Sequence, residues 1–544
     1  MKKTFIFAIA VLLISSGCQR NERVLIETGH PAGWIDYPIE TNVTVSWWVG
    51  MTDKVSSNFL NYGQIPFGKG LVERTGVNIE WIHPVITAQN EQFNLMVASG
   101  DLPDIFSRDM HRLYPGGPQK AFEDGIILRL NDIFERYAPN LMAYLKANPD
   151  IDRMVKTDTG DYFFFPFIRS GAYNDFPNIQ GTRKPYIFIG PLIRQDWLDE
   201  LGLNMPETID EWHLTLTAFK NRKGSSAPFT YEYTNHAYTH FFPFALAYGA
   251  PRGFFVGEDG FVRYGPVEDG RLEFLRTFAL WYREGLIDAD LISMRRQQVD
   301  AKMITGTSGV SMGALGSRMG AWITAARITN PNYHLVGAPW PVLNKGDKPR
   351  MSAVELPFTG VGSVYISTNN KNPHVAARLL DWAYSKEGHM FWNFGIEGES
   401  YNMIDGYPTY SDWVMNNPDG WTVDQAIAAY AMSADNGPMV QDIRYTEQQH
   451  VYQEQRDAVQ LWTIEGAENF LIPPITLTPQ ESREFAQIMS GIETYVDEME
   501  TKFILGTESL TGAAWASYAN TIRRLGIGRA LEIQDTAFAR YNAR

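Results

Sequence analysis

The segment Gly309-Val310-Ser311-Met312-Gly313 matches the G-x-S-x-G pattern of a nucleophile elbow. In that motif a strand lifts the serine above a sheet, and acid and histidine partners follow later in the chain. The residues just before it, Thr305 to Ser308, have little strand character. Without a preceding strand the match gives poor support to a hydrolase.

Two histidines and two glutamates also have spacings that could serve catalysis. His236 and His240 are four apart, but Ala237 stands where the zinc protease pattern requires a glutamate. Glu397 and Glu399 lie in a glycine-rich stretch, and their spacing does not establish the separation of a glycosidase carboxylate pair. No phosphate loop, dinucleotide fingerprint or cysteine metal site is found. We expect no enzyme, no metal and no cofactor.

Aromatic side chains offer another chemistry, because their faces stack on sugar rings as well as fill cores. The chain has 15 Trp, 26 Tyr and 31 Phe. Trp47 and Trp48 end a predicted strand, where ligands gather in α/β lobes. Alternation along the strand favours one ring in the core and the other in a cleft. Arg108 and Asp109 follow a later strand at the equivalent edge, where polar residues serve turns or ligands.

The elements that would position these residues alternate. The sequence predicts strands at 43–47, 77–82 and 105–106, with helices at 67–74 and 91–99 between them. This order is typical of an α/β lobe with a mostly parallel sheet. A chain of 544 residues is too long for one core, so we expect two lobes. Residues 420–470 and 480–544 are predicted to be largely helical.

The net charge and the N-terminal residues indicate what the protein binds and where in the cell it is found. A net charge of −15 without a basic cluster argues against nucleic acid binding. Lys2, Lys3 and the apolar run Phe5–Ile14 form a secretion signal that is too short to span a membrane. Cys18, the only cysteine, follows small residues as in a bacterial lipobox, although Ser15 stands where Leu is usual. We expect a lipoprotein, with ordinary signal cleavage as the alternative.

Several segments in order resemble family 1 extracellular solute-binding proteins, in the subgroup of large lipoproteins and alginate-oligosaccharide binders. The matching segments are Ala98–Ile105, Leu130–Ile133 with Tyr137–Asn140, Ile193–Leu203 with Pro206–Thr208 and Glu211, and Gly395–Tyr401. The matches cover most of the chain from about residue 43 to past 410.

The resemblance implies a two-lobed periplasmic-binding-protein-like fold of the α/β class. Each lobe would be a mostly parallel sheet flanked by helices, with a helical C-terminal extension. The expected division is 1–18 signal peptide with lipobox, 19–40 tether, 41–165 plus 355–395 first lobe, and 166–354 plus 396–544 second lobe. The implied cleft residues are Trp47, Trp48, Arg108, Asp109, Trp197, Tyr238, His240 and Tyr401.

One departure concerns calcium. Many members of the family carry an Asp/Asn-rich loop after the helix that here ends at Phe219-Lys220. Residues 221–228 instead contain Arg222 and Lys223, which cannot bind a hard cation. We therefore expect no calcium there.

The sequence thus predicts a monomeric, lipid-anchored receptor at the cell surface or in the periplasm. It would bind a carbohydrate between two closing lobes and deliver it to the permease subunits of an ABC importer. The alternatives are a surface glycoside hydrolase or esterase, revealed by turnover lost in Ser311→Ala or Glu399→Gln, and an outer-membrane glycan-binding lipoprotein. The last would show a helical repeat of about 34 residues, which the sequence lacks.

Overall fold

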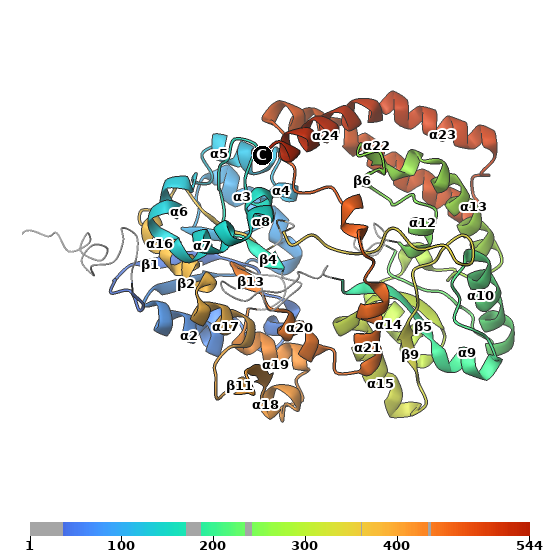
Figure 1. Cartoon of the computed structure of the whole chain (residues 1–544), viewed down its shortest axis with the longest axis horizontal. Helices are drawn as coiled ribbons and strands as arrows, with labels where there is room; N and C mark the ends of the chain where they lie inside the picture. Colours follow the sequence, from blue (N-terminus) through green and yellow to red (C-terminus); the bar gives the residue numbers. More distant parts are fainter. Residues whose placement is uncertain (1–35, 170–186, 234–241, 359, 361, 433–436) are drawn as a thin grey trace, which may run out of the picture.

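Two hydrophobic cores divide the chain into two lobes, which lie side by side in Figure 1. The computed structural model describes residues 36–169, 187–233, 242–358, 360, 362–432 and 437–544. The first core draws on residues 39–168, 358–392 and 428–440, and the second on 187–353 and 458–530. Each lobe is therefore assembled from segments that are distant in the sequence.

The first lobe is built on a four-stranded sheet of order β10-β3-β1-β2. β1 is parallel to β2 and to β3, and β10 joins the edge antiparallel to β3, so the sheet is mostly parallel as expected. β1 is a central strand, which leaves little of it exposed on either face. The strands are β1 (Thr44–Trp48), β2 (Asn78–Ile82), β3 (Ile105–Ser107) and β10 (Val364–Ile366).

Helices surround this sheet, and several of them end where the sequence places glycine. α2 stops at Gly76 and α3 at Gly100, each in the left-handed conformation that glycine adopts at little cost. The helices of this lobe are α1 (Asp53–Ser56), α2 (Pro66–Thr75), α3 (Gln89–Ser99), α4 (Met110–Leu113), α5 (Gly117–Glu123), α6 (Asn131–Tyr137), α7 (Pro139–Ala147), α8 (Pro149–Met154), α16 (Pro373–Asp381) and α17 (Lys386–Phe394).

The second lobe holds a three-stranded sheet in which β5 (Ile189–Arg194) lies between β8 (Val310–Ala314) and β9 (Leu335–Gly337). β5 is antiparallel to both neighbours, which differs from the mostly parallel sheet expected for this lobe. The reason is topological: β8 and β9 run in the same direction around α15 (Ala321–Thr329), and β5 enters between them from the first lobe.

The helices of the second lobe include one whose start the sequence makes explicit. Thr208 accepts the backbone N–H of Glu211 at 3.2 Å and Glu211 accepts that of Thr208 at 3.1 Å, a complete capping box. The remaining elements are α9 (Gln195–Leu201), α10 (Ile209–Lys223), α12 (Pro243–Ala247), the hairpin β6 (Phe254–Val256) and β7 (Val262–Tyr264), α13 (Asp269–Arg283), α14 (Arg296–Thr305) and α21 (Gln453–Trp462).

Residues 401–445 lie beside the first core, whereas the sequence reading placed 396–544 in the second lobe. A small core of Phe394, Tyr401, Tyr410 and neighbours continues from α17, so the chain has not yet crossed between lobes. This part contains β11 (Tyr401–Ile404), β12 (Tyr407–Tyr410), α18 (Asp412–Met415), α19 (Val423–Tyr430) and α20 (Ile443–Gln449). The crossing comes later, at α21, where Trp462 covers Gly190 so closely that a Cβ there would lie 2.3 Å from the indole.

Two further strands of the first core lie where the chain passes between the lobes. β4 (Phe167–Arg169) pairs in parallel with β13 (Met439–Gln441). Arg169 forms an ion pair with Glu355, and its backbone N–H donates to the Pro357 carbonyl at 2.7 Å. Segments that lead to and from the second lobe are thereby fastened to one another.

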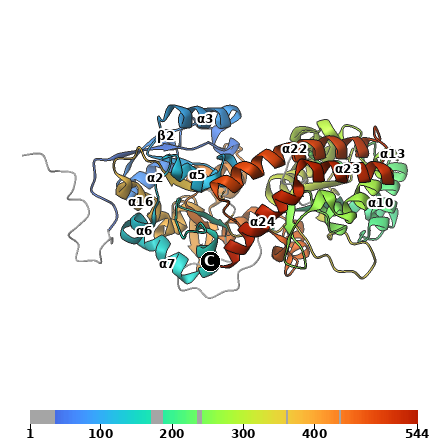
Figure 2. The same cartoon turned by 90° about the horizontal axis from the view of Figure 1, so that it is seen from above.

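A helical extension follows, as expected: α22 (Pro479–Leu505), α23 (Gly512–Leu525) and α24 (Ile527–Asn542). Figure 2 shows α22 and α24 crossing from the second lobe to the first. At the end of this arm Arg540 and Arg544 both donate to the Asp158 carboxylate of the first lobe, at 2.6 and 2.5 Å. Arg540 also donates to Glu481 at 2.6 Å, which ties the two helices together. Within the described residues no helix is long and apolar enough to cross a membrane.

Replacing Asp158 with alanine is expected to loosen the end of the arm. Arg544, whose side chain is 8% exposed, would lose its only acidic partner among the described residues, at a cost of about 1–3 kcal/mol. Hydrogen exchange of residues 536–544 should accelerate accordingly. Glu498→Ala, which breaks an exposed pair with Lys502 elsewhere in the extension, is the control. Equal exchange in the two variants would contradict the tether.

Candidate functional site

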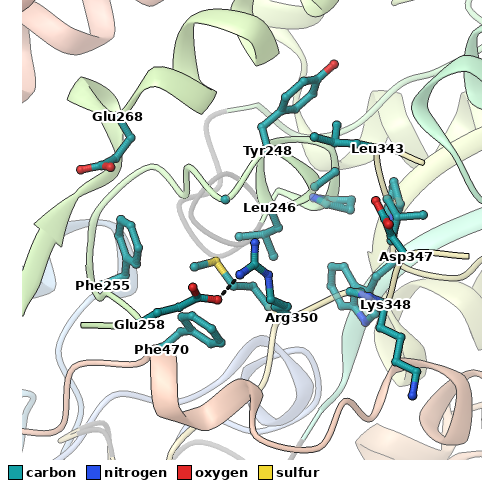
Figure 3. A pocket seen from close by; sticks show the side chains of 18 of the residues that line it. Leu246, Tyr248, Phe255, Glu258, Glu268, Leu343, Asp347, Lys348, Arg350 and Phe470 are labelled. Atoms are coloured by element: carbon teal, nitrogen blue, oxygen red, sulfur yellow. Dashed lines mark hydrogen bonds and ion pairs between the residues drawn. The ribbon is translucent and has the colours of Figure 1, made fainter. Parts of the chain in front are cut away.

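A cavity of about 610 Å³ lies in the second lobe, a size typical of small-ligand sites (Figure 3). Its walls come from residues 243–268, which comprise α12 and the β6–β7 hairpin, and from residues 340–351. Phe470 adds a further wall from η9 (Ala467–Phe470), the short helical turn between α21 and α22. The cavity therefore borders the segment that leads into the C-terminal arm.

Part of the cavity lining is aromatic. Trp340 is buried and its indole N–H donates to the Trp462 carbonyl at 3.0 Å, which fixes the ring. Tyr248 is held by a 2.7 Å hydrogen bond between its hydroxyl and that of Thr277. Phe470 is half-buried, and it stacks on no other aromatic ring in the part of the chain that the structure describes. Phe470 is thus more accessible than Trp340 and Phe255, the buried aromatic residues of the lining.

The charged residues of the lining balance one another. Glu258, Glu268 and Asp347 face Arg263, Lys348 and Arg350, three charges of each sign. Arg350 pairs with Glu258, as the dashed line in Figure 3 marks, and Arg263 pairs with Glu268 at 3.2 Å. The site therefore presents hydrogen-bonding groups without a net charge.

Polar residues also follow β3 in the first lobe. Arg108 and Asp109 stand directly after this strand, at the same edge as the end of β1. The Arg108 guanidinium lies over the Phe93 ring, with 5.2 Å from its carbon to the ring centroid, and donates to Asn90. Both residues are mostly buried, at 8% and 9% exposure. This edge is a second place where a ligand could be held.

Known proteins share this fold and part of this sequence. The sequence profile of the bacterial extracellular solute-binding protein family matches residues 148–390. The fold superposes on a crystal structure of the alginate-binding protein AlgQ2 without calcium, with a TM-score of 0.75 and 23% identity over 94% of this chain and all of that one. Residues 148–390 of the chain are thus similar to the bacterial extracellular solute-binding proteins, and the whole chain shares the fold of AlgQ2. The expected α/β fold class is confirmed.

Two named proteins are similar to this chain in sequence. The fructooligosaccharide ABC transporter substrate-binding protein FusA of Streptococcus pneumoniae is 29% identical over 236 residues, which span 40% of this chain and only 41% of FusA. The lipoprotein LipO of Bacillus subtilis is 22% identical over 467 residues, 81% of this chain and 82% of LipO. FusA in complex with kestose also shares the fold, with a TM-score of 0.72 and 19% identity over 92% of this chain and all of that one.

The predicted tryptophan pair is more buried than alternation suggested. Trp47 is fully buried, stacks on Trp81 with centroids 5.1 Å apart and donates to the Ser107 hydroxyl at 3.0 Å. Trp48 is 5% exposed and contacts Phe93. Helices cover both faces of this central strand, so the expectation of one ring in a cleft does not follow from alternation. Trp47 has no free face for a sugar.

Two further predicted residues also serve cores. Trp197 is packed edge-on against Phe219 in the second core, and Tyr401 packs on Phe394. Both are 5% exposed. Tyr238 and His240, together with His236 and the lipidation candidate Cys18, lie outside the described residues. The structure thus brings Trp48, Arg108 and Asp109 to one sheet edge, and Trp197 and Tyr401 to other places.

The catalytic patterns have structural explanations. Ser311 lies inside β8 rather than at a turn after it, is 1% exposed and donates to the Met312 carbonyl at 3.3 Å. A serine in the middle of a buried strand cannot act as an elbow nucleophile. Glu397 and Glu399 are exposed in the loop before β11.

The loop that replaces the family's acidic stretch is held by other contacts. α10 ends at Gly224, Lys223 pairs with Glu200, and Arg222 donates to the Leu201 carbonyl at 3.2 Å. Its cations thus fasten α10 to α9. Among the described residues no three acidic, histidine or cysteine side chains cluster closely enough to hold a metal ion.

The cavity residues were not predicted from sequence. They come from three segments, the last more than 100 residues beyond the others, and none carries a motif. The proline- and lysine-rich stretch 341–350 gave a weak signal, since two prolines flank a polar turn there.

Proposed function

We propose that this protein is an extracytoplasmic receptor that captures a sugar or oligosaccharide between its lobes and delivers it to the permease of an ABC importer. The observation that carries the proposal is the pair of separately cored lobes, with the segments that pass between them fastened together beside β4 and β13. Two such bodies on a shared joint can rotate and exclude water from a bound ligand. The relatives named as sugar-binding proteins support the ligand class.

The proposed receptor holds its ligand without changing it. The buried Ser311 and the exposed Glu397 and Glu399 provide no catalytic arrangement in the described residues. The name of LipO supports anchoring through a lipid on Cys18, which would keep the receptor near its permease. We further propose that Arg108 and Asp109 contribute ligand contacts at the edge of the first sheet.

Calorimetry with the full mature chain and a panel of neutral and acidic oligosaccharides tests the function. We expect binding of at least one saccharide without turnover, accompanied by a smaller radius of gyration in X-ray scattering. Arg108→Ala should weaken that binding by about tenfold, since truncating a central contact costs more than about 1 kcal/mol. Arg129→Ala removes a more exposed arginine of the same lobe, which pairs with Asp161 and also lies over a phenylalanine ring, Phe122, and it is the control.

Three results would count against the proposal. Binding of a peptide or another solute, with no binding of any saccharide, would show that the ligand is not a sugar. Release of cleaved sugar would show an enzyme. Equal affinities of the Arg108→Ala and Arg129→Ala variants would remove the proposed role of the sheet edge.

A further inference from the structure

We propose that the second-lobe cavity of Figure 3 is a saccharide site of its own, which takes a short uncharged oligosaccharide. This inference rests on the proposed function for its ligand class. The two sites differ in place, because the described residues that line the cavity are 243–268 and 340–351 of the second lobe and Phe470. Arg108 and Asp109 are not among its walls.

The balance of charge selects the ligand. Arg350 already has Glu258 as its partner, and Arg263 has Glu268 and Asp259, the latter at 2.8 Å. An anionic sugar would have to compete with these carboxylates for both arginines, and among the described cations of the lining only the exposed Lys348 has no acidic partner. Hydroxyl groups both donate and accept, so a neutral sugar can bond to both members of each pair without breaking it.

The aromatic walls favour a ring-shaped ligand with apolar faces. Phe470 lacks a stacking partner in the described chain, and Trp340 and Phe255 lie in the same lining. The C–H faces of a pyranose or furanose ring stack on such surfaces, while its edge bears the hydroxyls that meet the ion pairs. The aromatic rings of the lining thus suit the apolar faces of a sugar, and the paired charges suit its hydroxyl groups.

Phe470 lies in the segment that connects the second lobe to the C-terminal arm. This residue lies in η9, which packs beside β6 and connects α21 to the arm of α22 and α24. An occupant would contact both the body of the second lobe and this connecting segment. Binding should therefore protect residues 464–478 from hydrogen exchange as well as the cavity walls.

Titration of the full chain with neutral trisaccharides (kestose, raffinose, maltotriose and cellotriose) tests the site. For a saccharide that binds, we expect about two molecules per chain in the wild type and about one in each of Phe470→Ala and Arg108→Ala. Phe470→Tyr retains the ring and should restore the second molecule. Trigalacturonate should occupy the cavity at least about tenfold more weakly.

The outcomes separate this inference from the proposed function. One molecule per chain, lost in Arg108→Ala and unchanged in Phe470→Ala, would overturn the cavity site and leave the receptor intact. Cavity binding of trigalacturonate as tight as that of the neutral sugars would overturn the ligand class. If no saccharide bound to any form of the protein, both proposals would fail. Far-UV circular dichroism of each variant excludes misfolding as the cause of a lost site.

Discussion

Glu500→Ala should lower the free energy of unfolding by about 3–5 kcal/mol, because it leaves the Arg271 guanidinium buried without its counter-charge. The two side chains are 2% and 4% exposed and form two parallel hydrogen bonds, 2.8 Å from Nε and 2.5 Å from Nη2 of Arg271. Tyr518 donates to the same carboxylate at 3.3 Å. The pair joins α13 to α22 and so fixes the C-terminal arm to the second core.

Urea unfolding followed by tryptophan fluorescence measures this loss. Glu484→Ala breaks a comparable two-pronged pair with Arg529 on the exposed face of the same helix and should shift the midpoint far less. The double variant Arg271→Met/Glu500→Leu removes both charges and should recover much of the stability lost in Glu500→Ala. Equal midpoints for Glu500→Ala and Glu484→Ala would refute the proposed importance of the buried pair.

Acid should destabilise the protein through Asp442 as the pH falls from about 4 to 2. Burial alone would raise the pKa of this carboxyl, but hydrogen bonds with His389 and Arg444 outweigh burial and hold the pKa at about 2. Because the folded pKa lies below the unfolded value near 3.8, the ionised carboxylate stabilises the fold above that pH. Protonation at lower pH removes about 2 kcal/mol.

The comparison of Asp442→Asn with the wild type checks this assignment. The variant should be less stable at neutral pH, since His389 at 2.9 Å and Arg444 at 2.6 Å lose a buried anion. Its unfolding midpoint should also vary less between pH 4 and 2. Asp132→Asn, on the exposed face of α6, is the control. A variant with the full acid sensitivity of the wild type would show that another carboxylate is responsible.

The first lobe was predictable because its signals are local. β1, α2, β2, α3 and β3 follow one another in the chain, each bounded by its own turn or glycine, and the sheet joins them in a pattern that consecutive elements favour. The second sheet was less predictable, since the direction of β5 depends on strands that follow more than 100 residues later. The same holds for residues 401–445, whose lobe is set by packing on α17.

Site residues were the hardest to infer, for a physical reason. Trp47 and Trp48 looked like a sugar platform because a strand end is where ligands collect, but β1 is central and covered on both faces. Period-two alternation identifies an exposed ring only when one face of the sheet is open. Phe470 gave no signal, because its role depends on the distant segments that close the cavity around it.

The interleaving of segments between the two cores has a consequence for biogenesis. The edge strand β10 of the first sheet is synthesised more than 250 residues after its neighbour β3, and the second core awaits residues up to 530. Neither lobe can complete its core until these later residues have been synthesised. The apolar strands of the first sheet therefore remain without their full packing until late in synthesis, and exposed apolar surface of that kind is prone to aggregate.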